Sequence, residues 1–255
     1  MSKKKRERKY GSEEHQTGAA AAGSEITKFY WILGAVAVLG VGIISFRVGS
    51  SALSNTVTEP LVMELTDPAV LMQTARGVTK GNPDAEITII EFADFQCPAC
   101  REFHAQVKPL IEAEFIATGV AKFVYYDFPL VQIHPNAFLA ARAGHCAEDQ
   151  GKFWEFHDVL YRQQNSWAAQ PSPVGTFENY AGDLGLDAGE FSACVRGDKH
   201  ADVVTANMEL AAQMQAPGTP TIVVGKGQSV PLRVESSIDG IRRAVTSLTT
   251  PTTGG

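Results

Sequence analysis

Two cysteines in the segment FADFQCPACREFH, residues 92–104, are spaced so that their side chains could react with each other. At the start of a helix, the first cysteine of a Cys-x-x-Cys pair lies beside unpaired backbone N–H groups, which lower its pKa. Cys97 has this position, because Pro98 suits the first turn of a helix. Cys100 follows one turn later on the same side. The pair can therefore close and reopen a disulfide, with Cys97 attacking and Cys100 resolving.

Zinc binding and a purely structural bridge are the alternatives for this pair. A structural zinc site needs four ligands, usually as two closely spaced pairs. Cys146 and Cys194 are instead 48 residues apart, and no histidine pair with metal-ligand spacing accompanies the motif. We therefore expect no metal site. A bridge across two residues closes a very short loop and constrains the chain little, so a redox-active pair is favoured.

Glu91 and His104 lie near the motif and are candidates for moving or stabilising charge. Glu91 shares one face of a predicted strand with two isoleucines, where a carboxyl group is costly unless it has a function or a partner. It could be a buried acid that relays the proton of Cys100, or it could pair with Lys122 on the next strand. His104 could tune the thiolate, although a packed core histidine is the simpler interpretation.

The spacing of apolar residues predicts an α/β fold around these side chains. The predicted elements are a strand at 87–92, a helix at 98–118 kinked at Pro109, a strand at 121–128, helices from about 134 to 215, a strand at 218–225 and a helix at 235–247. The first strand, helix and strand form a βαβ unit, which normally has parallel strands. A helical segment of roughly 80 residues is thus inserted before the last strand.

The N-terminal region predicts a membrane anchor. Residues 29–46 are 18 uncharged residues, which span ~27 Å as a helix, close to the thickness of a bilayer core. The basic run 3–9 precedes them, so the N-terminus is expected in the cytoplasm and the rest of the chain outside it. A signal peptide cleaved within 50–54 and a buried core helix are the alternatives.

The resulting domain organisation has five parts. They are a basic cytoplasmic leader at 1–28, a single transmembrane helix at 29–46, a linker at 47–79 with one short helix near 68–75, a catalytic domain at 80–248 and a flexible tail at 249–255. The formal charge is +3 in the leader and −9 in the remainder. An acidic body argues against nucleic acid as a partner.

Three segments together resemble the DsbA-like branch of the thioredoxin superfamily. They are EFADFQCPACREFH, CAEDQGKFWEFHDVLY and GTPTIVVG, and the resemblance covers about 80–247. It implies a thioredoxin fold with an inserted helical domain and thiol–disulfide exchange outside the cytoplasm, without a bound cofactor. It also implies that Glu91 is the buried acid, that Pro220 is a cis-proline beside the sulfurs, and that the backbone at Thr219 pairs with the substrate chain.

The expected activity is that of a membrane-anchored protein dithiol oxidase. Its substrates would be reduced or unfolded secreted proteins, and by resemblance a quinone-linked membrane protein of the DsbB or vitamin K epoxide reductase type would re-oxidise it. The best-known oxidant members carry histidine where this chain has Ala99, so a reductase or isomerase is the alternative. The second alternative is a non-catalytic binding module or holdase that uses the groove at Thr219 and Pro220.

The two remaining cysteines, Cys146 and Cys194, are expected to form a structural disulfide. In an oxidising compartment, two unpaired thiols near a disulfide exchanger would be a liability. The alternative is two separately buried cysteines that pack as small apolar residues. The Cα separation, which decides between them, cannot be obtained from the sequence.

Overall fold

The computed structural model describes residues 56–227 and 229–250 of the chain. The predicted leader, the predicted transmembrane helix, the first part of the linker and most of the predicted tail lie outside the described residues. Within the described part of the chain, no helix is both long enough and apolar enough to cross a membrane.

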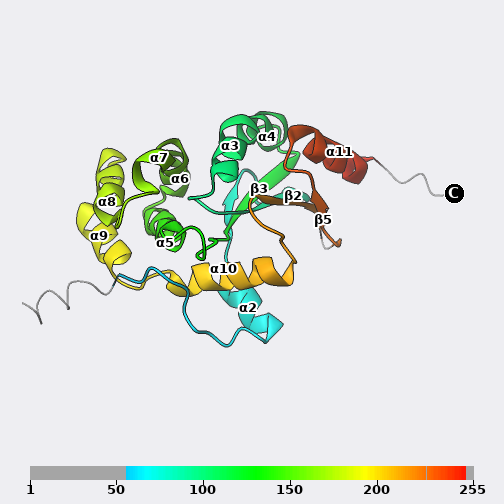
Figure 1. Cartoon of the computed structure of the whole chain (residues 1–255). Helices are drawn as coiled ribbons and strands as arrows, with labels where there is room; N and C mark the ends of the chain where they lie inside the picture. The colour runs from blue at the N-terminus through cyan, green and yellow to red at the C-terminus, as the bar shows by residue number, and fades with distance from the viewer. Residues whose placement is uncertain (1–55, 228, 251–255) are drawn as a thin grey trace, which may run out of the picture. The chain divides into compact units, whose positions relative to one another are not determined.

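A five-stranded sheet forms the centre of the domain (Figure 1). The strands are, in the order in which they lie in the sheet, β1 (Val78–Lys80), β3 (Ala121–Asp127), β2 (Ile87–Ala93), β4 (Thr221–Lys226) and β5 (Leu232–Val234). The central strand β2 is parallel to β3 and antiparallel to β4. The predicted parallel βαβ unit is therefore present, and β2 is apolar along most of its length because it is buried between neighbours on both sides.

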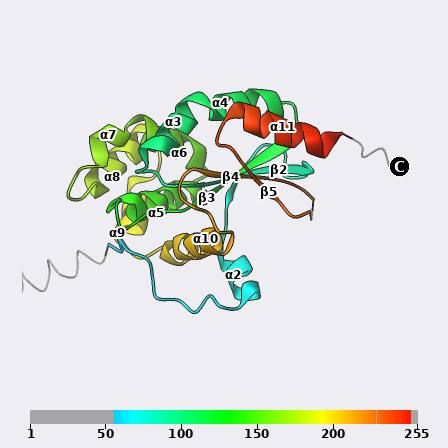
Figure 2. The ribbon, with the colours of Figure 1, turned by 45° about the vertical axis from the view of Figure 1, so that its right-hand side comes forward.

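Helices cover both faces of this sheet (Figures 1 and 2). On one side lie α3 (Pro98–Gln106), α4 (Lys108–Ile111), the π-helical turn η1 (Glu112–Ile116) and α11 (Ile238–Thr249). On the other lie α10 (Ala201–Gln213) and α2 (Pro68–Thr74). The kink predicted at Pro109 appears as a break at Val107, where α3 ends before α4 begins.

The predicted helical insertion is confirmed between β3 and β4. In addition to α10, it contains α5 (Ala137–Glu148), α6 (Phe153–Arg162), α7 (Gln164–Trp167), α8 (Val174–Asp183) and α9 (Ala188–Arg196). Most of its buried apolar side chains belong to the same core cluster as those of the sheet. Because the insertion and the sheet share one core, α6 and α7 are fixed against α3, which carries the Cys-x-x-Cys motif.

Residues of the predicted linker at 47–79 pack against the folded domain from Val57 onwards. The backbone N–H of Val57 donates to Gly197 at 3.2 Å, and Leu65 and Leu71 are buried with Ala206 of α10. The short helix predicted near 68–75 is present as α2, capped by the side chain of Asp67. The strand β1, which was not predicted, pairs with β3. The folded domain therefore begins well before residue 80.

Candidate active site

The Cys-x-x-Cys motif lies where β2 passes into α3. Cys97 is the N-cap residue, with extended backbone angles, and Pro98 occupies the first turn of the helix. Both thiols are free in the structure. Cys97 is 7% exposed, whereas Cys100 is completely buried. Only Cys97 can therefore meet an attacking sulfur from another protein, which is the geometry that the roles of attacking and resolving thiol require.

The two thiols differ strongly in acidity. Hydrogen bonding from Cys100, together with Thr219 and the backbone at Cys100 and Ala99, lowers the pKa of Cys97 to about 5 against the effect of desolvation. Desolvation raises the pKa of Cys100 well above its usual value, and hydrogen bonding to Cys97 raises it further. At neutral pH the reduced pair therefore holds one thiolate, on Cys97, and one proton, on Cys100.

The loop of Thr219 and Pro220 brings a backbone carbonyl oxygen to the reactive sulfur. The peptide bond between them is cis, and the Sγ of Cys97 lies 3.5 Å from the carbonyl oxygen of Thr219. β4 begins directly after them, at Thr221. The cis-proline loop thus brings backbone groups to the sulfur that a substrate would attack.

Glu91 is a buried acid beneath the motif. It is 1% exposed, and its Oε1 atom has no hydrogen-bond partner. Desolvation raises the pKa of Glu91 to about 8, while the nearby Lys108 lowers it. The alternative pairing with Lys122 is not found, because Lys122 donates to the carbonyl oxygen of Pro83 and the residue opposite Glu91 on β3 is Tyr125. The carboxyl is therefore neutral over most of the physiological pH range.

Lys108, which sequence reasoning did not single out, is the cation whose charge lowers the pKa of this acid. It is 3% exposed, on α4, and its Nζ lies 2.7 Å from Glu112 and 3.3 Å from Asp158. A buried lysine must be paired to stay charged, and two carboxylates meet that requirement. A lysine in a helix beside a proline gives no sequence signal of burial, so the buried ion pairs of Lys108 could not be predicted.

His104 packs in a cluster of aromatic rings and does not supply positive charge. Its ring stacks on Tyr161 at a centroid distance of 5.0 Å. Desolvation, together with the charge of Lys108, lowers the pKa of His104 to about 4. The imidazole is therefore neutral near pH 7. The tuning role considered for His104 has no support in this environment, whereas the simpler interpretation of a packed histidine agrees with it.

Two polar side chains, one local and one from the helical insertion, hold the turn before Cys97. The amide of Gln164, on α7, donates to the carbonyl oxygens of Phe95 and Cys97 at 2.7 and 2.9 Å. The buried carboxylate of Asp94 accepts from the backbone N–H of Gln96 at 2.7 Å. Sequence reasoning missed Asp94 and Gln164. The adjacency of Asp94 to the motif was a signal for the first, but none existed for the second.

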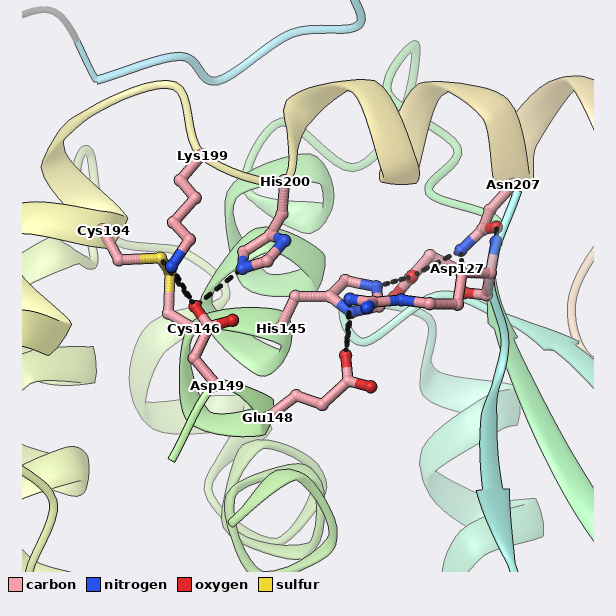
Figure 3. A network of polar contacts seen from close by, with 10 residues as sticks. Asp127, His145, Cys146, Glu148, Asp149, Cys194, Lys199, His200 and Asn207 are labelled. Atoms are coloured by element: carbon pink, nitrogen blue, oxygen red, sulfur yellow. Dashed lines mark hydrogen bonds and ion pairs between the residues drawn. A yellow bond between two sulfur atoms is a disulfide. The ribbon is translucent and has the colours of Figure 1, made fainter. Parts of the chain in front are cut away.

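Cys146 and Cys194 form the predicted disulfide, which joins α5 to α9 with a Cα–Cα distance of 5.8 Å (Figure 3). Asp149 lies beside it and accepts from Lys199 and His200, each at 2.8 Å. The bridge is therefore in the helical insertion and separate from the dithiol of the motif.

Next to the bridge, His145 links the insertion to the sheet (Figure 3). Its Nε2 lies 2.7 Å from Asp127, at the end of β3, and its Nδ1 lies 2.7 Å from Glu148. Desolvation lowers the pKa of His145, but interaction with Asp127 and Glu148 outweighs this effect and raises the pKa to about 9. A buried imidazolium held between two carboxylates thus fixes α5 on the end of β3.

Two groups of side chains in the described residues have the composition of a metal site. They are His104, His157 and Asp158, and Asp149, Cys194 and His200. In each group a lysine already neutralises the carboxylate, Lys108 in the first and Lys199 in the second. In the second group the sulfur is also bound in the disulfide. Neither arrangement provides a free set of ligands, so we assign no metal to them.

The fold and the dithiol define a DsbA-like protein, with a thioredoxin fold, inserted helices and a C-P-x-C motif. The sequence profile described as thioredoxin matches residues 73–243, which is most of the described chain. This protein therefore belongs to the thioredoxin family.

Individual similarities agree with this class. The chain is 24% identical over 169 residues to the probable disulfide bond formation protein D of Bacillus anthracis, covering 65% of this chain and 75% of that relative. The oxidised BdbD structure from Bacillus subtilis superposes with a TM-score of 0.58 at 24% identity, covering 68% and 96% of the two chains.

A second kind of relative is much longer than this chain. The Na(+)/H(+) antiporter NhaA 3 of Salinispora tropica is 29% identical over 181 residues, which are 71% of this chain but 26% of the antiporter. The chain thus spans about a quarter of the length of that relative. This partial similarity carries no conclusion about ion transport.

Proposed function

We propose that this protein is a thiol–disulfide oxidoreductase that acts through Cys97 and Cys100, most directly as a dithiol oxidase. The observation that carries the proposal is the asymmetry of the pair. Cys97 is 7% exposed and has a pKa of about 5, whereas Cys100 is completely buried and has a raised pKa. Thiol–disulfide exchange requires one stabilised thiolate and one protonated thiol in the reduced pair, whereas a structural disulfide requires neither.

The reaction consists of two exchanges that conserve atoms and electrons. A substrate thiolate attacks Sγ of Cys97 in the oxidised pair, a mixed disulfide forms, and the sulfur of Cys100 leaves. A second substrate thiolate then attacks the substrate sulfur of the mixed disulfide, so that the substrate disulfide forms and Cys97 leaves as a thiolate. The substrate loses two electrons and the pair gains them.

Glu91 donates and accepts the proton that Cys100 gains and loses in these exchanges. When Cys100 leaves, its thiolate is unstable in a buried position and takes up a proton. Glu91, with a pKa of about 8, is protonated near neutral pH and can donate it. On re-oxidation Cys100 must lose this proton, and the carboxylate of Glu91 can accept it. The acid thus stores one proton beside the buried thiol.

The direction of the reaction follows from the stability of the reduced form. A stabilised Cys97 thiolate favours the dithiol over the disulfide, which makes the pair a better oxidant. Representative pKa values for such cysteines are about 7 in thioredoxin and about 3.5 in DsbA. The pKa of about 5 for Cys97 lies between them. Although Ala99 removes one possible donor, oxidation of substrates is therefore favoured over reduction or isomerisation.

We further propose an extracytoplasmic location, with the chain anchored by residues 29–46 and a quinone-linked membrane protein as the re-oxidising partner. Reduced secreted proteins would be the substrates. A membrane-impermeant maleimide applied to intact cells should label reduced Cys97. Protection of Cys97 until the membrane is lysed would contradict this location.

Disulfide transfer to a reduced, unfolded model protein tests the proposed function. The oxidised domain should generate substrate disulfides stoichiometrically within minutes at pH 7, while its own Cys97 and Cys100 become reduced. A reductase would instead cleave the interchain disulfides of insulin efficiently under a thiol-reducing pool. A protein that binds the unfolded substrate without any change in thiol content would be a holdase, and the proposal would fail.

The raised pKa of Glu91 also predicts a dependence of stability on pH. The folded protein holds Glu91 with a pKa of about 8, above the ordinary 4.5. The neutral carboxyl therefore contributes its full stabilisation below about pH 4.5, and this contribution is lost as the pH rises to 8. Glu91→Gln removes the charge, so its stability relative to wild type should increase between pH 5 and 8, by on the order of 3 kcal/mol. Urea unfolding of both proteins in the same redox state measures this difference in the free energy of unfolding. A difference that stays constant from pH 5 to 8 would contradict the raised pKa of Glu91.

A further inference from the structure

Asp94 connects the active-site turn to a loop that belongs to another part of the chain. Its Oδ2 accepts from the backbone N–H of Leu130 at 2.8 Å and lies 2.7 Å from the Nδ1 of His134. Its own carbonyl oxygen accepts from the backbone N–H of Cys97 at 3.1 Å. One residue therefore holds both the imidazole of His134 and the backbone of the reactive cysteine.

The negative charge of Asp94 opposes formation of the thiolate at Cys97. This carboxylate is 1% exposed, so water screens it weakly, and it lies three residues before the sulfur that must become a thiolate. Two negative charges in a poorly solvated site repel each other. A nearby cation would offset this repulsion, and Ala99 and the neutral His104 do not provide one.

His134 meets this need. Its side chain is 16% exposed and contacts the carboxylate directly. The hydrogen bond with Asp94 raises the pKa of His134 above its ordinary value, and the charges of Asp94 and Cys97 raise it further against desolvation. Cys100 and Glu91, which act on Cys97 from the buried side, carry no positive charge.

We propose that His134, held as an imidazolium by Asp94, is a positioning residue that offsets the Asp94 carboxylate and so stabilises the Cys97 thiolate. The inference rests on the proposed function, since it concerns the thiolate released in each exchange. It assigns to the loop after β3 the stabilising charge that no residue of the Cys-Pro-Ala-Cys motif can supply.

The test is a pH titration of the Cys97 thiolate, followed by its ultraviolet absorbance after mild reduction that leaves Cys146 and Cys194 bridged. His134→Gln keeps a hydrogen-bonding side chain but no charge, and should raise the pKa of Cys97 by about one unit, a tenfold loss of thiolate at acidic pH. The matched control His104→Gln should titrate like wild type. A folded His134→Gln protein that also titrates like wild type would overturn the inference.

A second variant separates charge from packing. His134→Arg retains a cation and N–H donors for Asp94, and should keep most of the low pKa of Cys97. If His134→Gln and His134→Arg raise the pKa equally, the residue acts through packing and the inference is wrong.

The wild-type protein gives a measurement that does not depend on any variant folding. Coupling between two charges is reciprocal, so the imidazole of His134, followed by NMR, should titrate at a higher pH in the reduced protein than in the oxidised one. Equal values would overturn the inference. A wild-type Cys97 that titrates near 8.5 and transfers no disulfide would instead refute the proposed function itself.

Discussion

Replacement of Cys97 by serine should abolish disulfide transfer, by at least a factor of about a thousand, because serine cannot form the mixed disulfide through which both exchanges pass. Cys100→Ser should behave differently. Its Cys97 keeps a free thiol that is 7% exposed, so it should form mixed disulfides with oxidised substrates that no internal thiol can resolve.

Non-reducing electrophoresis of the two variants distinguishes these roles. Adducts should accumulate with Cys100→Ser and be absent with Cys97→Ser. Alkylation of the reduced wild-type protein at about pH 6 is the matched control, in which Cys97 should be labelled first. Preferential labelling of Cys100, or adducts through Cys100 in the Cys97→Ser protein, would reverse the assignment.

Removal of the second bridge should have the largest effect on stability. The bridge between Cys146 and Cys194 closes a loop with a sequence separation of 48 residues. The chain-entropy model assigns such a loop about 4 kcal/mol, as an upper value. Replacing both cysteines by alanine should therefore lower the melting temperature by roughly 10 °C, and disulfide transfer through Cys97 should be retained.

Two results would contradict this structural role. An unchanged melting temperature would mean that the bridge does not restrict the unfolded chain. Loss of disulfide transfer in a folded Cys146→Ala, Cys194→Ala protein would place the second pair on the path of the electrons. The single substitution Cys194→Ala is the matched comparison, because it opens the same bridge but leaves one thiol.

Local sequence signals were sufficient for the elements that carry the motif. A β-branched run followed by a Cys-Pro start predicted β2 and α3, and the disulfide between Cys146 and Cys194 was also predicted. The strands β1 and β5 were missed because each has three residues, too few for an alternating pattern to stand out. Pairing with longer strands, and not their own sequence, gives them their structure.

The charged surroundings of the site could not be predicted, because they depend on contacts between distant segments. Lys122 was considered as the partner of Glu91 since both lie on neighbouring strands, but the register places Lys122 opposite Thr88. Lys108, on a helix packed on the sheet, pairs with Glu112 and Asp158 and only lowers the pKa of Glu91 through its charge. His134 reaches Asp94 across 40 residues, and only the folded chain shows that the two are in contact.

The equilibrium redox potential of the Cys97 and Cys100 pair against glutathione tests the central claim most directly. A stabilised Cys97 thiolate predicts an oxidising pair, with a potential well above that of thioredoxin and towards the value of about −120 mV for DsbA. A potential near −270 mV, the value for cytosolic thioredoxin, would contradict the account and make the protein a reductase.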